Sequence, residues 1–116
     1  MMRDIDRINH MLEAVRKALR SVDGINKSTF LASEDKKAAA ERYVILIGEA
    51  ANMFSDELKE KYPLIPWHKM IGMRNFIAHE YMKVDYDLIW DTVKNDFPTL
   101  LPQLEDIAAA YPWPIP

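Results

Sequence analysis

Residues 73–81 read Met-Arg-Asn-Phe-Ile-Ala-His-Glu-Tyr, and the rest of the 116-residue chain is organised around them. This stretch places Arg74, Asn75, His79 and Tyr81 in an otherwise apolar segment with helical spacing. Burying such groups without partners costs a few kcal/mol each, so a core helix seldom carries them together unless they are paired or used. The stretch is therefore the candidate functional site, although a buried structural network would have the same composition.

The helix that carries this stretch should begin at Trp67 and run towards His79. The prolines within residues 62–67 break any earlier helix, because each restrains the residue before it. Each residue of an ideal helix advances about 100°, so Asn75 and His79 share a face, whereas Arg74 and His79 are about 140° apart. One helix alone therefore separates the arginine from the histidine, although the long arginine side chain can curl back.

The remaining chain also has the apolar spacing of helices. An amphipathic helix is predicted from residue 3 to about residue 20. After a connector over residues 25–32, a second helix should run from residue 33 to about residue 58, and it is apolar nearly all round, as is typical of a central helix. Asp85 should cap a fourth helix, and Pro98 fits the first turn of a fifth.

Two residues inside the second helix indicate how it packs. Gly48 costs roughly 1 kcal/mol relative to alanine in a helix interior, so we expect another helix to approach it closely. Glu49 places a charge in a run that reads as buried, and it should need a cationic partner. We count Glu49 as a residue that supports the candidate site.

No segment alternates with the period of a strand. The sequence therefore predicts an all-α protein, an antiparallel bundle of four to five helices with short loops. Residues 1–111 should form one domain, and the proline-rich residues 112–116 an extended C-terminal tail. The apolar content is generous for this length, so we expect self-association, most simply a two-fold dimer. The apolar residues expected to be exposed are Met70, Met73, Tyr81, Met82 and Trp113.

Composition excludes several functional classes. Hydrophobic residues make up 49% of the chain, but no apolar run approaches the roughly 18–20 residues that cross a bilayer. There is no cysteine for a disulfide or a thiolate metal site, and the N-terminus lacks the apolar core of a secretory signal. We therefore expect a cytoplasmic protein with no membrane partner. The net charge is −3, so binding to a nucleic acid would need a local basic cluster.

The residue types of the central stretch suit phosphodiester chemistry. Histidine moves protons near neutral pH, and arginine presents a fixed fork of donors to phosphate oxygens. An RNA 2′-hydroxyl that attacks its own phosphate needs a base, an acid and charge stabilisation, with no metal. Two copies meeting across a dimer axis would bring two arginines and two histidines around one cleft. In the structural alternative, Arg74 pairs with Glu49 or another acid and His79 caps the helix; residue types alone favour this alternative.

The pattern Arg74-x4-His79-x-Tyr81 resembles the R-x4-H-x-Y motif of the HepT-like family, within the HEPN superfamily of small helical ribonucleases. The resemblance extends over essentially the whole chain and is weakest in the tail after Tyr111. Besides the motif, the segments that carry it are Gly48-Glu49-Ala50, Ile65-Pro66-Trp67, Met73-Arg74-Asn75, Trp90 and Phe97-Pro98.

The resemblance implies a toxin of a two-gene toxin–antitoxin system whose partner is a minimal nucleotidyltransferase. Such proteins resemble HEPN ribonucleases that dimerise and cleave RNA without a metal or other cofactor. Arg74 and His79 match the catalytic pair, and Asn75 matches the polar residue within the motif. Tyr81 matches the tyrosine that the partner modifies with AMP. An adenylylated Tyr81 would place bulk and negative charge in the phosphate site and silence the toxin.

Two alternatives stay open. The first is a non-catalytic helical module that binds a nucleotidyltransferase, which the acidic net charge suits. The second is a metal-binding bundle, but the paired Glu-x-x-His motifs of di-iron bundles are absent. The residues that would form such a metal site are His10, Glu13, His68, His79 and Glu80.

Overall fold

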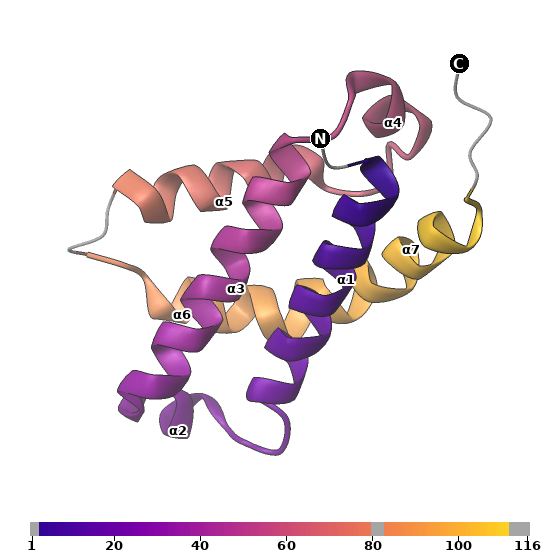
Figure 1. The fold of residues 1–116 in the computed structure, drawn as a ribbon. Helices are drawn as coiled ribbons and strands as arrows, with labels where there is room; N and C mark the ends of the chain where they lie inside the picture. Colours follow the sequence, from indigo (N-terminus) through magenta and orange to yellow (C-terminus); the bar gives the residue numbers. More distant parts are fainter. Residues whose placement is uncertain (1–2, 80–82, 112–116) are drawn as a thin grey trace.

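The protein is a bundle of helices built around α3 (Figure 1). The computed structural model describes residues 3–79 and 83–111. The central helix α3 (Glu34–Asn52) packs against α1 (Asp4–Ser21) and against α5 (Trp67–His79), and α1 and α3 run antiparallel (Figure 1). The described residues contain no strand, so the predicted all-α fold is confirmed.

The start of α3 follows from local chemistry. Ser33 is its N-cap, and the Ser33 hydroxyl oxygen accepts a hydrogen bond from the backbone N–H of Lys36 at 3.2 Å. Glu34 and Asp35 lie in the first turn, where the helix dipole favours negative charge. The predicted beginning of the second helix is therefore confirmed.

The predicted connector before it is wrong in part, because residues 27–32 form the short helix α2 (Lys27–Ala32). Asn26 caps this helix, and its Oδ1 accepts a hydrogen bond from the Thr29 N–H at 2.8 Å. Phe30 is fully buried, and its ring centroid lies 5.2 Å from that of Trp90. The helix is too short for its apolar spacing to stand out in the sequence.

The predicted second helix was too long. α3 ends at Asn52, and a separate helix α4 (Asp56–Lys61) follows. Ser55 caps α4, because its hydroxyl accepts a hydrogen bond from the Leu58 N–H at 3.2 Å. Between the two helices the chain turns so that Phe54 packs into the core. A serine that competes as an N-cap therefore divides a run that reads as one helix.

The predicted fourth and fifth helices are parts of one continuous rod. Its segments are α6 (Tyr86–Asp91), the π-helical η1 (Thr92–Asp96) and α7 (Phe97–Ala109). The Asp85 cap is confirmed, since its Oδ1 accepts a hydrogen bond from the Leu88 N–H at 3.0 Å. The widened π turn falls just before Pro98, whose missing N–H already interrupts the helical hydrogen-bond ladder.

The core corrects the expectation of exposed methionines. Met70 and Met73 are buried, and the Thr92 hydroxyl lies 3.2 Å from the Met73 sulfur. Tyr81, Met82 and Trp113 lie outside the described residues. Among the helices of the described ranges, none is both long enough and apolar enough to cross a bilayer.

Candidate functional site

α5 positions the candidate site, and its start is anchored by Trp67. The Trp67 indole N–H donates to the carbonyl oxygen of Tyr62 at 3.0 Å, and its ring lies edge-on to Phe54, with 5.4 Å between centroids. One face of α5 then buries Met70, Met73 and Ile77. This fixes the rotation of the helix, and therefore the direction in which residues 74–76 leave it.

Gly48 of α3 allows α5 to come close. A Cβ on Gly48 would collide with the Cβ of Arg74 and lie only 2.7 Å from the carbonyl oxygen of Met70. The expected close approach at Gly48 is therefore confirmed. It brings the base of the Arg74 side chain against the α3 backbone, and the guanidinium must extend from there along the surface of α3.

The guanidinium of Arg74 is oriented but only loosely paired. Its Nη1 donates to Oδ1 of Asn75 at 3.0 Å, and its Nη2 lies 3.9 Å from Oε1 of Glu49. The Arg74 and Glu49 side chains are 38% and 45% exposed, and an ion pair this long and this exposed contributes little to stability. The Nε of Arg74 is buried and has no hydrogen-bond partner among the described residues. A structural arginine would have that donor satisfied, because an unpaired buried donor costs about 1–3 kcal/mol.

Glu49 has the cationic partner that the sequence predicted, but it is not buried as its neighbours suggested. The carboxylate stands at the edge of α3, where it faces both solvent and Arg74. The structural alternative pairs Arg74 with Glu49 or another acid, and the structure does contain the Arg74–Glu49 pair, although as a long and half-exposed contact.

The structure describes some of the other predicted site residues and not others. Asn75 is exposed and lies beside Arg74. His79 is the last residue of α5, a position that suits both a helix-capping and a catalytic histidine. Its side chain is not described. Tyr81 lies outside the described residues. The structure thus brings Arg74, Asn75 and Glu49 together.

The structure shows an exposed face of α5 that the sequence did not reveal, although one of its members, His68, was a candidate metal ligand. His68, Gly72 and Phe76 follow one another at intervals of four, so they share one face of the helix, and all three are exposed. Asn75 borders the same face. The helical spacing was available in the sequence, but only the packing against α3 shows which face of α5 is left open.

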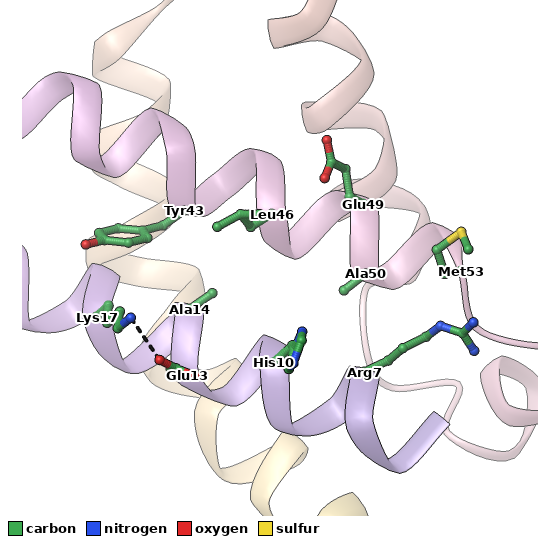
Figure 2. A pocket seen from close by; sticks show the side chains of 10 residues that line it. All are labelled: Arg7, His10, Glu13, Ala14, Lys17, Tyr43, Leu46, Glu49, Ala50 and Met53. Carbon is green, nitrogen blue, oxygen red and sulfur yellow. Dashed lines mark ion pairs between the residues drawn. The ribbon is translucent and has the colours of Figure 1, made fainter. Parts of the chain in front are cut away.

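A groove of about 590 Å³ lies between α1 and α3 (Figure 2). Ala14, Leu46 and Ala50 form its apolar middle. Glu49 also lines the groove, but Figure 2 shows its carboxylate turned away from α1, and Arg74 of α5 is its partner on that side. The groove and the Arg74 site therefore meet at Glu49.

The metal-binding alternative finds no support in the placed part of the chain. Residues 3–79 and 83–111 contain no cluster of three or more side chains suited to hold a metal ion. Glu13 pairs with Lys17 at 2.8 Å, and this hydrogen bond lowers the pKa of the Glu13 carboxyl. Glu13 therefore has a partner other than His10. The side chain of His79, and Glu80, lie outside what is described.

Residues 11–107 match the family model described as "Ribonuclease HepT-like", which places the protein in the class of small helical ribonucleases. The match covers most of the chain, and the chain belongs to the HepT-like ribonuclease family.

Individual relatives agree with this assignment. A protein of Methanocaldococcus jannaschii, named as a candidate RNase, is 32% identical over 95 residues, which cover 82% of this chain and 87% of the relative. A protein of Caldanaerobacter subterraneus subsp. tengcongensis with the same kind of name is 32% identical over 86% of this chain and 89% of its own. A Thermococcus cleftensis protein, named as a probable ribonuclease HepT, is 31% identical over 83% and 91%. No solved structure matches the chain at a significant level.

Proposed function

We propose that this protein is a metal-independent endoribonuclease whose catalytic pair is Arg74 and His79. The observation that carries the proposal is the state of Arg74, which is held in place by Asn75 and the α3 backbone and yet has a buried Nε without a partner. A guanidinium so arranged suits a phosphate that arrives with the substrate, because it is charged, oriented and not consumed by a tight ion pair. Membership of the ribonuclease family supports RNA as that substrate.

In the proposed reaction His79 takes the proton of an RNA 2′-hydroxyl. The 2′-oxygen then forms a bond to the adjacent phosphorus, and the bond from phosphorus to the 5′-oxygen breaks. The leaving 5′-oxygen takes up a proton, so the products are a 2′,3′-cyclic phosphate and a 5′-hydroxyl end. Arg74 stabilises the charge that builds on the phosphate oxygens, and Asn75 and Glu49 position its guanidinium.

The proposed site is a cleft shared by two copies of the chain. On an ideal helix, positions 74 and 79 are about 140° apart, so one helix by itself would not direct both side chains at one phosphate. A second copy related by a two-fold axis would supply a histidine opposite each arginine. The homodimer, or a higher assembly built from it, is therefore part of this proposal.

The role of Arg74 and His79 is tested with the variants Arg74→Ala and His79→Ala in an RNA cleavage assay. Each should lower cleavage by roughly a hundredfold or more, since each removes charge stabilisation or proton transfer. Arg42→Ala is the matched control, because Arg42 is an exposed arginine of α3 that should leave cleavage unchanged. Full activity in both site variants would refute the catalytic assignment, provided that circular dichroism shows all three variants to be folded.

We further propose that the protein is the toxin of a two-gene toxin–antitoxin system and that a partner nucleotidyltransferase silences it at Tyr81. In that step the Tyr81 oxygen forms a bond to the α-phosphorus of ATP, pyrophosphate leaves, and the phenolic proton goes to solvent. The AMP group would bring negative charge within two residues of His79. Mass spectrometry after incubation with the partner and ATP should find AMP on Tyr81, and modification confined to another residue would refute the assignment.

The second candidate function is a non-catalytic module that binds the nucleotidyltransferase, and the net charge of −3 favours it. Growth arrest on expression separates the two. Arrest by the parent chain that is lost in His79→Ala supports the nuclease, whereas no arrest together with tight binding of the transferase supports the module. A small nucleotidyltransferase gene beside this one would support the two-gene system in either case.

A further inference from the structure

Nothing that the structure describes within the subunit requires glycine at position 72. Its φ is not positive, it is exposed, and a Cβ added to it would meet no atom of residues 3–79 and 83–111 within 4 Å. Glycine in an exposed helix interior is less stable than alanine, so the residue is costly where it stands. Gly48, by contrast, has the Arg74 side chain packed against it. The space left at Gly72 therefore points to something that approaches α5 from outside the subunit.

Phe76 lies one turn further along the same face. Its side chain is 49% exposed, although an aromatic ring on a helix surface is usually covered when a neighbour is available. Asn75 is next to it in the chain and holds the guanidinium of Arg74 through Oδ1. Arg74 and Phe76 lie on different sides of α5, with Asn75 between them, so a strand that passes Asn75 would meet both an exposed aromatic ring and an oriented arginine. These two groups match the two parts of a nucleotide, which are a flat base and a phosphate.

The charge of α5 favours an anionic occupant of this face. Residues 67–79 contain Lys69, Arg74 and two histidines, and no aspartate or glutamate, in a chain whose net charge is −3. Acidic groups of other elements border them, since Lys69 pairs with Asp96 at 2.7 Å and Glu49 lies near Arg74. The helix itself nevertheless carries only cationic and neutral side chains, and this favours an anionic ligand at its exposed face.

We propose that the α5 face formed by His68, Gly72, Asn75 and Phe76 binds single-stranded RNA next to the cleaved phosphate. A base stacks on the Phe76 ring, and the ribose–phosphate backbone passes over Gly72, where a side chain would block it. Asn75 joins this face to the Arg74 guanidinium. This inference rests on the proposed ribonuclease function and adds the residues that hold the strand.

Binding is measured with a fluorescein-labelled, mixed-sequence 2′-O-methyl RNA of about ten nucleotides, which cannot react through its 2′-oxygen. Phe76→Ala should weaken binding about tenfold or more, and Phe76→Trp should keep it, because any large aromatic ring can stack. Leu88→Ala is the control, since Leu88 is an exposed apolar residue of α6 and does not belong to α5. Equal affinity of Phe76→Ala and the parent would overturn the inference.

Gly72→Ala gives a second and independent readout. It should raise Tm by a few degrees, because alanine favours the helix and no described residue obstructs a Cβ. The same change should weaken RNA binding and raise KM for cleavage, because the strand can no longer come as close. A raised Tm with unchanged RNA affinity would show that nothing approaches Gly72, and the inference would fail.

The remaining outcomes separate this inference from the proposed function and from a protein occupant. RNA binding that depends on Phe76 and Gly72 in a parent chain that cleaves nothing would support the binding face and refute the nuclease. Cleavage by the parent chain with no change in KM for Phe76→Ala or Gly72→Ala would support the nuclease and refute the binding face. If Phe76→Ala instead converts a dimer to a monomer with unchanged affinity per chain, then a second copy covers the face and the RNA proposal is wrong.

Discussion

Arg74 is distinguished by how little of its hydrogen-bonding capacity the subunit uses. The contact to Glu49 is long, the acceptor on Asn75 is a neutral amide oxygen, and Nε has no partner among the described residues. Glu49→Gln should therefore alter the orientation of the Arg74 guanidinium and leave the stability of the fold nearly unchanged, because an exposed pair at this distance contributes well under 1 kcal/mol.

Also at the scale of a single residue, Gly48→Ala should destabilise the fold. The added Cβ would collide with Arg74 and with the backbone carbonyl of Met70, which cannot rotate away, so α3 and α5 would have to separate. We expect a loss of about 1–3 kcal/mol in the free energy of unfolding, in spite of the better helix propensity of alanine. Urea unfolding measures this loss. Gly72→Ala is the matched control, because no described atom lies within 4 Å of the added Cβ, and it should raise the free energy of unfolding. A stabilised Gly48→Ala would contradict the close packing.

At the scale of elements, α3 supports several neighbours at once. Towards α6 it presents Glu41, whose Oε1 accepts a hydrogen bond from the Tyr86 hydroxyl at 2.6 Å, and Lys37, whose ammonium lies 5.0 Å from the centre of the Tyr86 ring. The hydrogen bond to the Glu41 carboxylate raises the pKa of Tyr86 to about 12. This contact fixes the start of the long rod relative to α3, and thus to the site.

Tyr86→Phe should lower the free energy of unfolding by about 1 kcal/mol at neutral pH, the typical net value of such a bond. Because the folded pKa is raised, the contribution is fully present below pH 10 and is lost as the pH rises towards 12. The stability difference between parent and variant, followed by urea unfolding from neutral to alkaline pH, should therefore shrink only above pH 10. A difference that grows with pH would contradict the assignment.

At the scale of the whole molecule, charge is unevenly distributed. The chain carries a net charge of −3, whereas α5 carries no acidic residue. A polyanion is therefore attracted to one helix rather than to the whole surface, and raised salt should weaken RNA binding.

The composite cleft makes a prediction about assembly. Light scattering should give twice the 13.5 kDa mass of the chain. Mixing Arg74→Ala with His79→Ala should restore part of the cleavage activity, because a mixed dimer still places one arginine opposite one histidine. A single-chain mass, or a mixture as inactive as its components, would refute a site shared between copies.

Much of the fold could be predicted because its signals are local. Ser33 and Asp85 cap helices where the sequence placed them, and Gly48 marks a close contact. The errors came where two local signals competed. Asn26 and Ser55 start short helices inside segments that read as a connector and as a continuous helix. Pro98 reads as a new helix start, but the π turn before it allows the rod to continue.

The sequence by itself determined that the protein is helical and which family motif it carries, because apolar spacing, caps and motif residues are properties of neighbours along the chain. Only the tertiary structure decided the rotation of α5 against α3. That rotation leaves Arg74 half-exposed and loosely held, and leaves Gly72 and Phe76 facing outwards. The physical reason is that periodicity specifies an apolar face, whereas the partner of each polar group depends on how closely two distant helices pack.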